Sequence, residues 1–154
     1  MKRYGAVLVT AIAVLLAGNL WACGDSLYRV GKGISYRVYT APLPGSVLVY
    51  GNTEGARQLA DALAESGHKV QLVESQVDLS LEMGKGGYDV VIAAYSDHDT
   101  VESTASETTF LPVATSKEEA QAAGQDYREV MLADRDEIKD YLKAIHKTLK
   151  AKAS

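Results

Sequence analysis

The chain has 154 residues, a formal net charge of −4 at pH 7 and a single cysteine. This length is enough for one domain with a hydrophobic core. A single cysteine excludes an intramolecular disulfide. The acidic balance argues against a nucleic-acid partner, because binding to phosphates needs clustered Lys and Arg.

The first 22 residues have the layout of a bacterial export signal. Lys2 and Arg3 precede an apolar run over residues 6–17, which is shorter than the roughly 20 residues of a membrane-spanning helix. We therefore expect export and removal of residues 1–22. The mature chain then keeps 132 of the 154 residues and loses two of the 16 basic side chains, so its surface is more acidic.

Residues 20–23 resemble the lipobox of bacterial lipoproteins, in which a cysteine becomes the lipid-modified amino terminus. Leu20 and Ala22 occupy the small and apolar positions before Cys23. The resemblance implies that lipidated Cys23 attaches the protein to the outer membrane. The alternative is ordinary cleavage after Ala22, which releases a periplasmic protein with a free thiol at Cys23.

Residues 27–40 contain two β-prone runs around a Gly-Lys-Gly turn, a pattern that predicts a β-hairpin. The triplet Tyr-Arg-Val occurs in both runs. Tyr and Arg are enriched in binding hot spots, and a hairpin edge can accept a strand from a partner. The predicted partner-binding residues are Tyr28, Arg29, Tyr36 and Arg37. Alternatively, the hairpin folds back and its tyrosines cover one end of the main domain.

Apolar runs alternate with amphipathic segments from residue 46 onward, after a linker interrupted by Pro42 and Pro44. We therefore assign residues 23–45 to the hairpin and linker, and residues 46–154 to one α/β domain. The predicted strands cover residues 47–50, 69–73, 88–95, 110–115 and 127–133. The predicted helices cover residues 53–66, 76–83, 99–106 and 116–123, with a last helix after residue 134.

Helix ends are predicted from capping residues. Gly67 and Gly124 are expected to end the first and fourth helices. Asp134 and Glu137 have capping-box spacing and are expected to begin the last helix. The expected buried face of that helix consists of Ile138, Leu142, Ile145 and Leu149.

Repeated strand-then-helix units require a parallel sheet with right-handed crossovers and helices on both faces. The predicted fold is a doubly wound five-stranded α/β sheet in the order 2-1-3-4-5. The run at residues 88–95 is the most apolar and is expected to be the most buried strand. Residues 69–73 alternate in polarity, which is typical of a strand near the sheet edge.

Residues 46–150 resemble a response-regulator receiver domain, chiefly in the run at residues 88–94, in Leu111-Pro112-Val113 and in the closing Asp136-Glu137-Ile138. The resemblance implies the same fold. The chemistry of that family uses an acidic pair after the first strand, a phosphorylatable aspartate ending the third strand and a lysine ending the fifth.

The residues at those receiver positions do not carry the family's chemistry. Gly51-Asn52 replaces the acidic pair, Ala94 replaces the aspartate and Met131-Leu132 closes the fifth strand. Thr115 alone matches, at the position of the family's switch hydroxyl. The resemblance therefore implies a degenerate pseudo-receiver without phosphotransfer.

Residues 50–55 resemble the end of the flavodoxin phosphate loop. Such a loop directs backbone amides and hydroxyls at a phosphate on a helix amino terminus. This weaker resemblance implies FMN or a nucleotide bound by Gly51, Asn52 and Thr53. The alternative is a plain strand-to-helix turn in which Glu54 interacts favourably with the helix dipole.

Asp97-His98-Asp99 follows the third strand, where ligands bind in such folds. These residue types can bind a divalent metal, but adjacent side chains rarely face one ion, so we expect a solvated loop and no metal. His68 and His146 are expected on the surface. The sequence contains no Gly-x-Ser-x-Gly motif of a serine hydrolase.

We therefore expect an exported, non-catalytic, receiver-like interaction or accessory module of the bacterial cell envelope, without a cofactor. Its partner would be another envelope protein, and its location the periplasm or the outer membrane. The alternative is an exported flavodoxin-like protein that binds FMN or a nucleotide.

Overall fold

The structure is a computed structural model that describes residues 40–105 and 107–154. The predicted export signal, the lipidation site Cys23 and the hairpin with Tyr28, Arg29, Tyr36 and Arg37 lie outside these residues. They remain predictions from the sequence.

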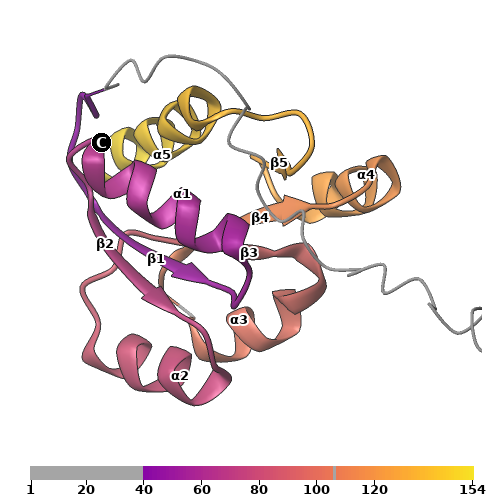
Figure 1. Ribbon diagram of the computed structural model, residues 1–154, viewed down its shortest axis with the longest axis horizontal. Helices are drawn as coiled ribbons and strands as arrows, with labels where there is room; N and C mark the ends of the chain where they lie inside the picture. Colours follow the sequence, from indigo (N-terminus) through magenta and orange to yellow (C-terminus); the bar gives the residue numbers. More distant parts are fainter. Residues whose placement is uncertain (1–39, 106) are drawn as a thin grey trace, which may run out of the picture.

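Five parallel strands form one sheet in the order β2-β1-β3-β4-β5, which confirms the predicted fold class (Figure 1). The register places Val49 of β1 opposite Leu72 of β2 and Ile92 of β3. The strands are β1 (Ser46–Tyr50), β2 (Lys69–Val73), β3 (Val90–Ala94), β4 (Thr109–Ala114) and β5 (Met131–Leu132).

Helices cover both faces of the sheet, as the alternating pattern predicted (Figure 1). Side chains of α1 and α5 pack on one face, and those of α2 and α3 on the other, while α4 extends beyond β4 and β5. The helices are α1 (Glu54–Glu65), α2 (Gln76–Lys85), α3 (His98–Thr104), α4 (Lys117–Asp126) and α5 (Ile138–Lys152), with a 3-10 turn at Tyr95–Asp97.

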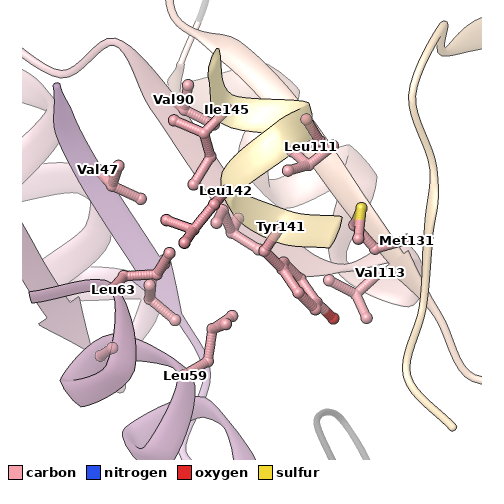
Figure 2. Packing of buried hydrophobic residues seen from close by; sticks show 14 of the residues in the cluster. Val47, Leu59, Leu63, Val90, Leu111, Val113, Met131, Tyr141, Leu142 and Ile145 are labelled. Carbon is pink, nitrogen blue, oxygen red and sulfur yellow. The ribbon is translucent and has the colours of Figure 1, made fainter. Parts of the chain in front are cut away.

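The larger core lies between the sheet and the pair α1 and α5, whose side chains meet over the strands in Figure 2. Leu142, Ile145 and Leu149 are buried as predicted, and Ile138 is partly buried against them. Tyr141 is only 2% exposed and belongs to the same core, although the sequence analysis did not single it out. Burial of each large apolar side chain contributes about 1.5–3 kcal/mol.

The burial of the strands follows the sequence pattern. All five residues of β3 are buried, so the most apolar run is the most buried strand. β2 is an edge strand, and its side chains alternate between exposed and partly buried positions. Gly67 has a φ of +100° directly after the last residues of α1, which confirms it as the residue that ends this helix.

The last third of the chain differs from three predictions. α4 continues through Gly124 to Asp126, because the Tyr127 N–H bonds to the Ala123 carbonyl at 2.9 Å. β5 contains only two residues, instead of the run from 127 to 133. The ring of Tyr127 instead packs edge-on against Phe110, with ring centroids 5.2 Å apart.

The start of α5 also differs from the prediction. Asp134 lies in a turn in which the Asp136 N–H bonds to the Leu132 carbonyl at 2.9 Å. The helix begins three residues later with Glu137 as its N-cap, and the Glu137 N–H donates to the Asp140 carboxylate at 3.0 Å. The capping box is therefore formed by Glu137 and Asp140, because the turn must finish before the helix can begin.

His68 is buried, contrary to the prediction of a surface position, and is only 6% exposed. Its Nδ1 accepts a hydrogen bond from the Gly45 N–H at 3.1 Å. The Lys69 N–H bonds in turn to the Gly45 carbonyl at 2.9 Å. This imidazole therefore joins the segment before β1 to the turn before β2, and burial lowers its pKa.

We predict that replacing His68 with Asn makes stability less dependent on pH. Because burial lowers the native pKa of His68, the unfolded chain takes up the proton first, so wild-type stability falls as the pH drops through about 6.5. Asn keeps an acceptor for the Gly45 N–H but does not titrate. Urea denaturation at pH values of about 7.5 and 5.5 should give a smaller stability difference for the variant. An equal difference in both proteins would contradict the assignment.

Candidate functional site

The carboxyl edge of the sheet is where ligands bind in doubly wound folds, at the point where successive crossovers go to opposite faces. Here α1 follows β1 onto one face and α3 follows β3 onto the other (Figure 1). The two turns at this point are residues 51–53 and 95–97. They contain the predicted cofactor-binding residues Gly51, Asn52 and Thr53, and the first residue of the Asp97-His98-Asp99 segment.

The turn after β1 is tightly packed against α1. Gly51 has a φ of +155°, and its N–H bonds to the Val73 carbonyl at 3.0 Å. A Cβ at this position would lie 3.3 Å from the Cβ of Ala56. Thr53 is the N-cap of α1, and its hydroxyl accepts the Ala56 N–H at 3.2 Å. The Thr53 hydroxyl therefore serves the helix, as in the predicted plain strand-to-helix turn.

Tyr50 and Asp97 lie near each other across this edge, at the ends of β1 and of the 3-10 turn. Burial raises the pKa of the Asp97 carboxyl. Burial also raises the pKa of the Tyr50 hydroxyl, and the nearby negative charge of Asp97 adds to the effect. Both groups are therefore partly desolvated at the switch point.

The Asp97-His98-Asp99 segment is helical, which corrects the prediction of a solvated loop. Its first residue ends the 3-10 turn, and the other two begin α3. The ring of His98 stacks on Tyr95 with centroids 4.9 Å apart, and its Nδ1 bonds to the Tyr95 carbonyl at 2.9 Å. Within residues 40–105 and 107–154, no group of three or more His, Cys, Asp or Glu side chains is arranged to hold a metal ion.

Thr115, the residue at the receiver's switch position, is held by the chain's own carboxylate. Its N–H and its hydroxyl both donate to Glu119 Oε2, at 2.8 and 2.9 Å. The Glu119 N–H donates to the Ser116 hydroxyl at 3.1 Å. These bonds close the first turn of α4 and occupy two donors with which an anion at the end of β4 could interact.

The end of β5 is closed in the same way. The Leu132 N–H donates to Asp136 Oδ2 at 2.8 Å. The other oxygen of this carboxylate accepts from Arg135 Nε at 3.1 Å. Asp136 is part of the segment that resembles a receiver domain, and here its role is to cap the turn before α5.

The resemblance to a receiver domain also assigns a position at the end of β3. Ala94 ends β3 where the phosphate-accepting aspartate would stand, and it is 4% exposed. The edge thus lacks a carboxylate acceptor at the end of β3. Two backbone N–H groups at the ends of β4 and β5, those of Thr115 and Leu132, are bound by Glu119 and Asp136.

An aromatic group beside β4 was missed by the sequence analysis. Tyr127 packs edge-on against Phe110 and Tyr95, with centroid distances of 5.2 and 6.4 Å. The Tyr127 hydroxyl donates to the Glu102 carboxylate, and burial together with this bond raises the pKa of Tyr127. These residues come from β4, the 3-10 turn, α3 and the end of α4, so no local pattern indicated their contact.

No protein-family model, curated protein or solved structure matches this chain. The function must therefore be inferred from the side chains themselves. In the part of the chain that the structure describes, no helix is long and apolar enough to cross a membrane.

We predict that replacing Glu119 with Ala lowers the free energy of unfolding by about 1 kcal/mol, because it removes both hydrogen bonds from Thr115. Replacing the neighbouring exposed Glu118 with Ala is the matched control, since it removes a carboxylate from the same turn. Urea denaturation should separate the two variants. Equal stabilities would show that the Thr115 contacts contribute nothing.

Proposed function

We propose that this protein is a non-catalytic, receiver-like interaction module that is exported to the bacterial cell envelope. The observation that supports it best is the closed carboxyl edge of the sheet. Glu119 binds the donors of Thr115, and Asp136 binds the N–H of Leu132. These three donors, with which a bound phosphoryl group could interact, already have carboxylate partners.

The absence of the family's acidic residues at Gly51, Asn52 and Ala94 agrees with this proposal. Without a carboxylate at these positions there is neither a ligand set for magnesium nor an acceptor for the phosphoryl group. A receiver-like domain that cannot be phosphorylated lacks the family's phosphorylation switch. Such a domain acts through a fixed binding surface.

The proposed partner is another envelope protein, and the proposed contact residues lie in the amino-terminal segment. Tyr28, Arg29, Tyr36 and Arg37 combine aromatic area with charged, planar groups, a composition that is common in binding hot spots. Their place before the domain leaves the α/β sheet intact while the segment contacts the partner. The anchoring proposal places this module in the periplasm or, through Cys23, on the outer membrane.

The anchoring proposal has a direct test. Mass spectrometry of protein extracted from membranes should identify a peptide that begins at Cys23 and carries the mass of bound acyl chains. A soluble product that begins with an unmodified Cys23 would instead establish ordinary cleavage and a periplasmic location.

We predict that acetyl phosphate with magnesium does not label the protein, because Ala94 replaces the acceptor and Gly51-Asn52 replaces the acidic pair. Intact-mass measurement checks this, with an active receiver domain as the positive control. A hydroxylamine-sensitive phosphoryl adduct on any aspartate would contradict the proposal. The visible absorbance of the same sample tests the alternative, because a bound flavin would make it yellow and would replace the proposal with a flavodoxin-like function.

A further inference from the structure

No strand pairs with the outer edge of β2 in the part of the chain that the structure describes. On its inner side, the Lys69 N–H bonds to Gly45 and the Val73 carbonyl accepts from Gly51. Because alternate residues of a strand direct their amides to opposite sides, Val70 and Leu72 direct theirs away from β1. In agreement with this, the Leu72 carbonyl bonds to a side chain and not to β1: it accepts a hydrogen bond from Gln71 Nε2 at 3.1 Å.

An exposed apolar stripe on α2 lies beside this edge. Val77 and Leu81 are one helical turn apart and are 69% and 61% exposed. Between β2 and α2 is a hollow of about 420 Å³, and Leu72 and Leu81 contribute to its lining together with charged residues. A free strand edge beside exposed apolar side chains is a surface that folded proteins usually cover.

Charges on this surface are separated along the strand direction. β2 begins with Lys69 and is followed by Glu74, whereas α2 returns in the opposite direction, with Asp78 in its first turn and Lys85 in its last. Within the chain, Lys85 pairs with Glu82, and Glu74 pairs with Arg57 at 2.8 Å. Together with Lys69 and Asp78, these groups leave a net positive charge at the amino end of this surface and a net negative charge at its carboxyl end. A surface with this arrangement complements a copy of itself that is turned end to end.

We propose that β2 and α2 form a symmetric interface with a second copy of this chain. An antiparallel pairing of β2 with its copy, centred on Gln71, places Val70 opposite Leu72 of the second copy. The outward amides of these two residues then form hydrogen-bonded pairs, and the sheet continues through both subunits.

The same two-fold axis aligns the helices. With Leu81 on the axis, the two α2 helices run antiparallel and the Leu81 side chains meet. Asp78 of each copy then lies beside Lys85 of the other, and Lys69 lies beside Glu74. The pairing thus satisfies the strand edge, covers the apolar stripe and brings opposite charges together. This inference concerns assembly and does not depend on the proposed non-catalytic function.

Sedimentation velocity of the purified full chain over a range of concentrations tests the proposal. The wild-type protein should form a dimer. Leu81→Lys should raise the dimer dissociation constant by about tenfold or more, because it places two lysines on the axis. Gln121→Lys is the matched control, since this exposed side chain lies on α4 at the other end of the sheet, and it should leave the dimer unchanged.

A charge exchange tests the contacts across the axis. Circular dichroism of each variant checks that it folds, because Asp78 also accepts the Ser75 hydroxyl and Lys85 also pairs with Glu82. Asp78→Lys and Lys85→Glu should each weaken the dimer, because each places like charges together, and the double variant should restore it. A double variant that is no better than either single variant would overturn the proposed pairing. So would a monomeric wild type, which would leave the β2 edge to a different strand, or a dimer that Leu81→Lys does not weaken.

Discussion

The structure depends on the burial of β3 from both faces. Its five residues, from Val90 to Ala94, lie between β1 and β4 and are at most 4% exposed. No polar side chain can be placed there without a buried partner. This requirement brings helices onto both faces of the sheet, and it leaves the loops at the strand ends as the places for polar chemistry.

In those loops, side chains of the protein itself bind backbone N–H groups. Where parallel strands end and helices begin, several backbone N–H groups lack a partner in the sheet or helix. In many proteins of this architecture a bound ligand supplies the acceptors at the sheet's carboxyl edge. Here Thr53, Glu119 and Asp136 supply them after β1, β4 and β5. This difference connects the fold to the proposed non-catalytic function.

The opposite kind of surface occurs at β2. Within residues 40–105 and 107–154, no strand pairs with the outward backbone groups of Val70 and Leu72, and exposed Val77 and Leu81 lie beside them. The carboxyl edge is thus internally satisfied, while the β2 edge can still form hydrogen bonds. An interaction module needs such a surface, and the strand edge and the amino-terminal segment are two separate candidates for it.

Much of the fold was predictable because its signals are local. The continuous apolar run in β3 and the alternating run in β2 indicated a central and an edge strand, and Gly67 indicated the end of α1. The predicted start of α5 was wrong because two acidic residues, Asp134 and Glu137, could each serve as the N-cap. Only the turn around Leu132 decides between them.

The candidate site was less predictable because its contacts join distant residues. His68 was predicted on the surface because it is a polar residue that follows a helix. Its burial is explained by its bond to Gly45, which is 23 residues away in the sequence. Tyr95 and Tyr127 likewise meet through the fold. The contact between Thr115 and Glu119 is local and could have been predicted. Ser116 and Glu119 have the spacing of a capping box at the start of α4.

The central claim is that the protein's own carboxylates occupy the donors at the carboxyl edge. The most direct measurement is an NMR titration that follows the backbone amide signals of Thr115 and Leu132. Their chemical shifts should change when Glu119 and Asp136 are replaced with Gln and Asn, and in the wild type they should not respond to millimolar phosphate or FMN at neutral pH. Saturable shifts of these two amides on addition of either ligand at neutral pH would contradict the account.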